Sequence, residues 1–136
     1  MTMLTPRIRL FFICAHCEID EQSNTITLVN PVFELRLPKD VQFPFIVGSL
    51  YAYANLSEGL GSFRLHVEVS DEEGRLITKS KPFRVDYTVA NRKEGDEYVF
   101  AIPEFKIEKP GVYTVGLYQN YKCIVTTDVC LLSFGE

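Results

Sequence analysis

The sequence predicts an all-β fold in which antiparallel sheets form a sandwich, with no significant helix. Apolar and polar residues alternate along most of the chain, which is the period of a strand. Turn signals recur about every 8–12 residues, a spacing typical of a sandwich or barrel. No window of about ten or more residues shows the apolar period of an amphipathic helix. We therefore expect about eight or nine strands of Greek-key type, in a single domain over residues 1–136.

The first half of the chain divides into four apolar stretches. Residues 8–19 are apolar on both faces in the middle, which indicates a strand that is central or inserted between layers. A polar turn leads to a second strand over 25–29, and a half-buried strand follows over 33–37. Residues 41–54 form a long apolar segment, and Pro44 places that part of it on an edge or at a bend.

The second half alternates more regularly. Residues 63–69 give the cleanest strand, and an acidic turn closes a hairpin into residues 75–80. Residues 83–89 alternate in the same way and precede a charged loop over 91–97. The chain then runs through expected strands at 98–102, 105–107 and 112–118, a polar turn at Gln119-Asn120, a return strand carrying Cys123 and Val125, and a last strand at 129–134.

Composition excludes several functions. The formal net charge is −4 and no run of Lys and Arg exceeds two residues, so we expect no nucleic-acid binding. The apolar run over 10–15 is shorter than a secretory signal needs and far shorter than a bilayer span, so we expect no membrane association. We therefore place the protein in the cytoplasm, with its four cysteines reduced.

Cys14-Ala15-His16-Cys17 is the most conspicuous motif, because it has the C-x-x-C spacing of disulfide oxidoreductases. That chemistry needs two sulfur atoms close together, with the first at a helix N-terminus. Positions three apart on a strand point to opposite faces, and nothing after Cys17 has a helical pattern. Two buried structural cysteines are the favoured interpretation, and a redox role for Cys14 and Cys17 is the alternative.

Metal and nucleophilic sites are weakly supported. A zinc site could be assembled from Cys14, His16, Cys17, Cys123 and Cys130. Structural zinc prefers closely paired ligands, and six residues separate the last two cysteines. A Cys–His catalytic pair would need His16 or His66 as base, and we expect His66 to face solvent on the polar side of its strand. We therefore predict no catalytic, cofactor-binding or metal-binding residue, and no enzyme activity.

Four tyrosines fall on faces or turns that are not clearly dedicated to the core: Tyr51, Tyr53, Tyr118 and Tyr121. Exposed tyrosine is a good contact residue, because it brings a large area at low entropic cost. The alternative is that these rings flank the core with their hydroxyl groups in water. Whether they form a binding surface stays open at this point.

Pro110-Gly111 is a turn signal, and Gly111-Val112-Tyr113-Thr114-Val115 follows it. This segment resembles the G-x-Y-x-C segment of immunoglobulin-type domains, in which the tyrosine forms a corner and the cysteine a core disulfide. Val115 takes the place of the cysteine, Lys109 stands where an acid is usual, and the chain has no Trp. The resemblance implies an Ig-like β-sandwich without the disulfide.

The whole chain also resembles a family of small bacterial all-β domains of unknown function. The matching features are Cys17-Glu18-Ile19-Asp20, Thr27-Leu28-Val29, the aromatic pair in Phe43-Pro44-Phe45, and a closing strand from Pro110-Gly111-Val112-Tyr113 to Leu117-Tyr118. Asn30-Pro31 departs from the glycine expected after Leu28-Val29. These are scaffold features, and the resemblance implies no catalytic residue.

We therefore expect a non-enzymatic protein-interaction or scaffold module that binds a protein partner or itself through a strand edge or loop. Sandwiches present open strand edges, and such edges pair readily with other chains. One alternative is a small thiol or zinc protein that uses Cys14 and Cys17. Another is a ligand- or carbohydrate-binding module that uses exposed tyrosines. We expect no cofactor.

Overall fold

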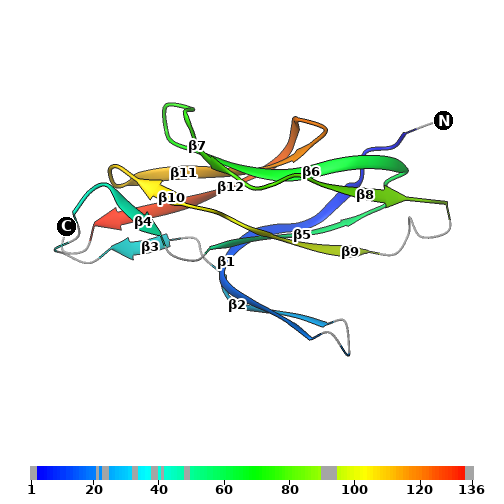
Figure 1. The fold of residues 1–136 in the computed structure, drawn as a ribbon, viewed down its shortest axis with the longest axis horizontal. Helices are drawn as coiled ribbons and strands as arrows, with labels where there is room; N and C mark the ends of the chain where they lie inside the picture. Colours follow the sequence, from blue (N-terminus) through cyan, green and yellow to red (C-terminus); the bar gives the residue numbers. More distant parts are fainter. Residues whose placement is uncertain are drawn as a thin grey trace.

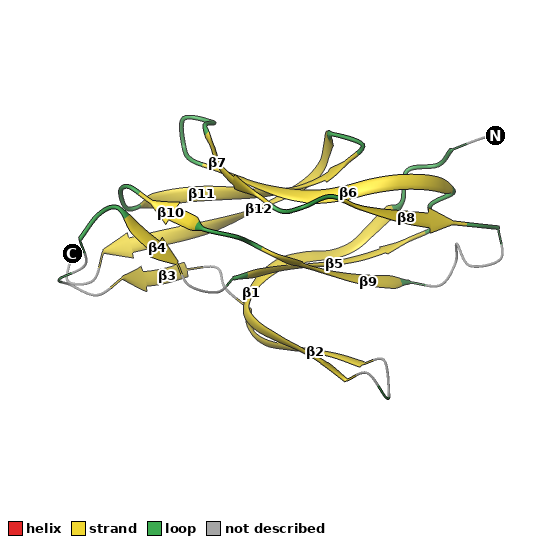
Figure 2. Ribbon diagram, in the orientation of Figure 1, coloured by secondary structure: helices red, strands yellow, loops and turns green. Residues whose placement is uncertain are grey.

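A computed structural model describes residues 3–20, 22, 25–31, 34–37, 40, 42–47, 50–89 and 95–133. All regular secondary structure in these residues is β-strand, and none of it is helix (Figure 2). The predicted all-β class without helix is confirmed. No helix in this part of the chain is long and apolar enough to cross a membrane.

The described residues form twelve strands, where the sequence predicted about eight or nine. They are β1 (Arg7–Asp20), β2 (Thr25–Pro31), β3 (Glu34–Leu37), β4 (Phe45–Val47), β5 (Tyr51–Ser57), β6 (Gly61–Ser70), β7 (Leu76–Lys79), β8 (Phe83–Tyr87), β9 (Asp96–Ala101), β10 (Phe105–Ile107), β11 (Gly111–Gln119) and β12 (Lys122–Ser133). Four of them, β3, β4, β7 and β10, have only three or four residues. Three of these, β3, β7 and β10, fall in the strands expected at 33–37, 75–80 and 105–107, whereas β4 falls inside the long apolar segment over 41–54.

The strands form three sheets. A six-stranded sheet has the order β3-β12-β11-β6-β7, with β8 also paired to β6. A four-stranded sheet has the order β2-β1-β5-β9, and β10 pairs with β4 in a small sheet of two strands. Every pair is antiparallel except β12 with β3, which is parallel. The expectation of purely antiparallel sheets is therefore wrong at this edge, and the six-stranded sheet is mixed.

The two larger sheets lie as stacked layers, with β6, β11 and β12 above β1, β5 and β9 in Figure 1. Their inward-facing side chains form one apolar core. These are Phe63, Leu65, Val67, Val69, Val115, Leu117, Val129 and Leu131 from the six-stranded sheet, and Ile13, Ala52, Ala54, Leu56 and Phe100 from the four-stranded sheet. Burial of each large side chain contributes roughly 1.5–3 kcal/mol, so the contact between these layers is the main source of stability.

The small sheet is attached to the body by an aromatic contact. Phe105 of β10 is 1% exposed, and its ring packs edge-on against Tyr113 of β11 with centroids 5.3 Å apart. The Tyr113 hydroxyl donates to the backbone oxygen of Lys109 at 2.7 Å, which fixes the turn that enters β11. Burial raises the pKa of Tyr113 above its ordinary value.

Candidate interaction site

The edge strand β8 is the candidate site. It pairs with β6 in antiparallel register, with Phe63 opposite Val85 and Ser62 opposite Asp86. No other described strand pairs with β8. The other strand on this edge, β7, is partly covered, because Thr78 Oγ1 donates to the backbone oxygen of Pro103 at 2.6 Å. Among the described residues, the edge is therefore most open along β8.

The backbone direction of β6 follows from its contact with the β11–β12 hairpin. The amide nitrogen of Asn120 donates to the backbone oxygen of Arg64 at 2.9 Å. The amide nitrogen of Arg64 donates in turn to Asn120 Oδ1 at 2.9 Å. Both backbone groups of Arg64 therefore point toward β11. Because successive residues of a strand direct these groups to opposite edges, those of the neighbouring Phe63 point toward β8.

The same alternation fixes the direction of the β8 backbone. Phe63 lies opposite Val85, so the N–H and C=O groups of Val85 face β6. The N–H and C=O groups of Arg84 and Asp86, on either side of it, point away from β6 toward the open edge. Two residues of β8 thus offer a donor and an acceptor each to an incoming extended chain.

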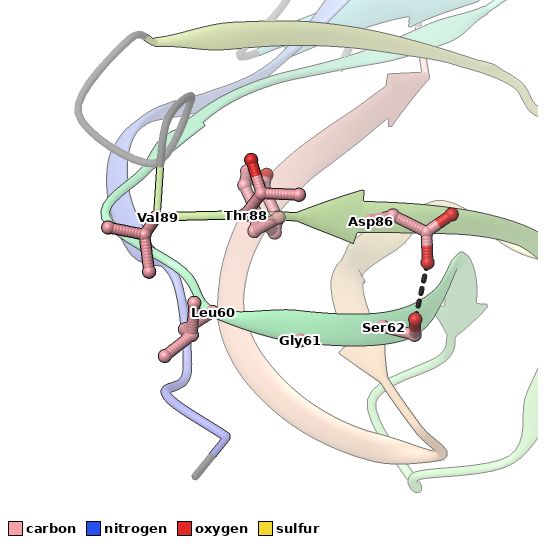
Figure 3. Close-up of a pocket in the computed structure, with 7 residues that line it drawn as sticks. Leu60, Gly61, Ser62, Asp86, Thr88 and Val89 are labelled. Atoms are coloured by element: carbon pink, nitrogen blue, oxygen red, sulfur yellow. Dashed lines mark hydrogen bonds between the residues drawn. The ribbon is translucent and has the colours of Figure 1, made fainter. Parts of the chain in front are cut away.

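The side chains of these two residues form an exposed polar group on the outer face. Ser62 Oγ donates to Asp86 Oδ1 (Figure 3). Arg84 Nε donates to the same Asp86 oxygen at 3.2 Å, and Arg84 Nη2 donates to Ser62 Oγ at 3.1 Å. The bond from Ser62, and then that from Arg84, lowers the pKa of the Asp86 carboxyl below its usual range. Asp86 Oδ2 receives no hydrogen bond from any residue in the described ranges.

The inward side of β8 is held against β9. Phe83 stacks on Phe100 with ring centroids 5.0 Å apart, and the hydroxyl groups of Tyr87 and Tyr98 lie 3.1 Å apart. Burial raises the pKa of both tyrosines. Of the described strands, only β5 pairs with β9. The open edges of the two stacked sheets therefore lie on the same side of the molecule (Figure 1).

A shallow pocket of about 540 Å³ adjoins the end of β8 (Figure 3). Its lining residues are Leu60, Gly61, Ser62, Asp86, Tyr87, Thr88 and Val89. Val89 is 78% exposed, and Leu4 joins this end of the molecule through a bridge to Leu60. An apolar side chain carried by a partner segment would find matching surface here.

The four tyrosines singled out in the sequence do not form one surface. Tyr51 and Tyr53 lie on β5 in the four-stranded sheet, whereas Tyr118 and Tyr121 lie at the β11–β12 hairpin of the six-stranded sheet. Tyr53 is 4% exposed, packs on Phe12 with centroids 5.1 Å apart, and donates its hydroxyl hydrogen bond to Glu97. Tyr53 lies on the face of β5 opposite the core-facing Ala52 and Ala54, but it is buried there, so the predicted exposure of its hydroxyl to water is wrong.

Tyr121 is the most exposed of the four, at 71%. Asn120 and Tyr121 have φ angles of 48° and 67°, so both take the left-handed conformation required by a type I′ hairpin turn. The turn is therefore one residue later than the predicted Gln119-Asn120. Tyr121 is displayed at the tip of this hairpin.

The predicted solvent exposure of His66 is wrong. His66 does lie on the outer face of β6, yet it is only 4% exposed. Tyr118 stacks on its ring with centroids 5.1 Å apart, Tyr121 lies at 5.9 Å, and Nε2 is 2.8 Å from Glu68 Oε2. Gly116 leaves the space that Tyr118 and Cys123 fill beside it. Aromatic rings from β11 and from the β11–β12 turn thus cover a position that alternation alone assigns to solvent.

The predicted ligand set is divided between sheets. Cys14 is fully buried in β1 of the four-stranded sheet, whereas Cys123 and Cys130 lie on β12 of the six-stranded sheet. The side chains of His16 and Cys17 lie outside the described residues. Across the described ranges, no group of three or more His, Cys, Asp and Glu side chains is placed to hold a metal ion.

No family model matches this chain, and no curated protein matches it.

Proposed function

We propose that this protein is a non-enzymatic protein-interaction module that accepts an extended segment of a partner along β8. The observation that carries the proposal is the outward direction of the Arg84 and Asp86 backbone groups on an edge that pairs with no other described strand. An added strand gains affinity from main-chain hydrogen bonds and specificity from pockets for its side chains. The apolar pocket lined in part by Val89 could accept one side chain of the added strand.

We also propose that the scaffold is an Ig-like sandwich of Greek-key type and that the protein is located in the bacterial cytoplasm. Two features support the Ig-like assignment. Two sheets stack over one core, and the Tyr113 hydroxyl bonds to a backbone oxygen four residues upstream, as the tyrosine corner of immunoglobulin-type domains does. A zinc site that joins Cys14 to Cys123 and Cys130 is less well supported, because Cys14 lies in a different sheet from those two cysteines.

Replacing Asp86 with proline tests the proposed edge. Asp86→Pro removes one outward N–H donor, whereas its matched control Asp86→Ala removes the same carboxylate but keeps that donor. The fold should tolerate the proline, because edge strands accept it where the N–H faces solvent. We expect a partner isolated with the wild-type protein to bind Asp86→Pro on the order of tenfold more weakly than Asp86→Ala, as measured by calorimetry.

Equal binding of that partner by the wild type and both variants would show that the β8 edge is not the interface. Thermal unfolding of both variants checks that the fold is intact. Steady turnover by the purified protein, surviving repurification and abolished by a single substitution, would contradict the non-enzymatic assignment itself.

A further inference from the structure

We infer that the chain which pairs with β8 is β8 of a second copy of this protein, antiparallel to the first about a two-fold axis at Val85. The inference rests on the proposed function and names the partner. The β8 sequence reads Phe83-Arg84-Val85-Asp86-Tyr87, with Val85 flanked on each side by one charged residue and then one aromatic residue. This order is symmetric in residue type and opposite in charge about its centre.

Antiparallel pairing about Val85 places each Arg84 opposite Asp86 of the second copy, and each Phe83 opposite Tyr87. Opposite charges directly across a strand pair are stabilising. Both side chains are exposed on the outer face, and Asp86 Oδ2 receives no bond from the described residues, so it can accept the second guanidinium. The two Arg–Asp pairs are equivalent by symmetry, as an isologous interface requires.

The backbone satisfies the same register. Arg84 and Asp86 direct their N–H and C=O groups outward, so each Arg84–Asp86 pair exchanges both of its main-chain hydrogen bonds. Val85 meets its counterpart in the non-hydrogen-bonded position between them. A two-fold axis perpendicular to the sheet keeps the buried side of both β8 strands facing the core. The dimer is then one sheet running through both molecules.

Other registers are disfavoured by charge. A shift of one residue would set core-facing side chains opposite solvent-facing ones. Registers that keep the faces aligned are centred instead on Arg84 or on Asp86, and these place like charges directly opposite each other. Like charges in that position are destabilising. Among these three registers, only the one centred on Val85 places opposite charges across from each other. In that register β8 is complementary in charge to itself, so we identify the added strand as β8 of a second copy.

This register also brings residues of the second copy next to the pocket at the end of β8. Pro82 of the second copy falls opposite Thr88, and its Lys81 falls opposite Val89, the residue 78% exposed at the apolar pocket. Pro82 is exposed and directly precedes β8. The pyrrolidine ring would therefore approach the apolar lining of the pocket, which adds side-chain contact to the backbone ladder.

Charge reversal at the two positions tests the register. Arg84→Asp places two acids opposite each other, and Asp86→Arg places two bases opposite each other. We expect each single variant to raise the dimer dissociation constant on the order of tenfold or more in sedimentation equilibrium. The double variant R84D/D86R restores opposite charges and should recover dimerisation. An equimolar mixture of R84D and D86R should form the heterodimer in preference to either homodimer, as read by native mass spectrometry.

A wild-type protein that stays monomeric across the concentration series overturns self-pairing, and so does a dimer indifferent to both charge reversals. In either case the proposed function is judged separately, by whether Asp86→Pro weakens binding of a different partner relative to Asp86→Ala. Thermal unfolding of the reversed variants confirms that a loss of dimer is not a loss of fold.

Discussion

Truncation of Phe105 to alanine is expected to lower the free energy of unfolding by about 3–5 kcal/mol. Phe105 is 1% exposed, and its ring packs on Tyr113 at 5.3 Å. Its strand, β10, pairs with β4 alone among the described strands, so side-chain burial attaches this small sheet to the body. Removal of the ring loses its burial and leaves a cavity that the flanking strands fill only in part.

The measurement is urea unfolding, with the midpoint lowered and the slope unchanged. Lys106→Ala in the same strand is the matched control, because Lys106 is exposed and should change stability by no more than about 0.5 kcal/mol. A loss of less than about 1 kcal/mol for Phe105→Ala would mean that the small sheet contributes little to the fold.

Alkaline pH is expected to destabilise the protein through its buried phenols. Burial is the main cause that raises the pKa of Tyr53 to about 12, and it also raises the pKa of Tyr87, Tyr98 and Tyr113. The hydrogen bond to Glu97 raises the Tyr53 value further. An unfolded chain titrates tyrosine near about 10. The folded state therefore favours the protonated phenols.

The sign of the pH effect follows from these shifts. Each phenol contributes fully to the free energy of unfolding below about pH 10. This contribution is lost as the pH rises from there through the higher pKa of the folded state. We expect the free energy of unfolding to fall by on the order of 1 kcal/mol for each buried phenol by about pH 11, measured as a lower urea midpoint. Tyr53→Phe should flatten the profile, whereas Tyr121→Phe, at an exposed site, should not. A midpoint that stays constant to pH 11 would contradict the burial of these hydroxyl groups.

Periodicity predicted the parts of the fold that depend on one strand and its face. Residues 63–69 alternate in sequence, and Phe63, Leu65, Val67 and Val69 are all buried in the core. The same pattern over 83–89 predicted the inward side of β8 correctly as far as Tyr87, but β8 ends there and Val89 is 78% exposed. These assignments are local, since a strand that contributes one face to a core must alternate whatever lies beside it.

Features that depend on neighbouring strands could not be predicted in this way. His66 occupies a polar-face position, but rings from the adjacent hairpin cover it. Tyr53 is buried because the ring of Phe12, which lies opposite it on β1, packs against it. The parallel pairing of β3 with β12 and the edge position of β8 depend on the order of strands in the sheet. Alternation reports the face of a residue and carries no information about which strand comes next.

Residue-resolved amide hydrogen exchange gives the most direct test of the open β8 edge. In dilute, monomeric protein, the Val85 amide should exchange slowly because it bonds to β6, whereas the Arg84 and Asp86 amides should exchange at nearly unprotected rates. Both outward amides should become protected when a strand docks, on addition of a partner or on raising the protein concentration. Slow exchange of Arg84 and Asp86 in the dilute monomer would mean that the edge is already occupied, and it would contradict the account.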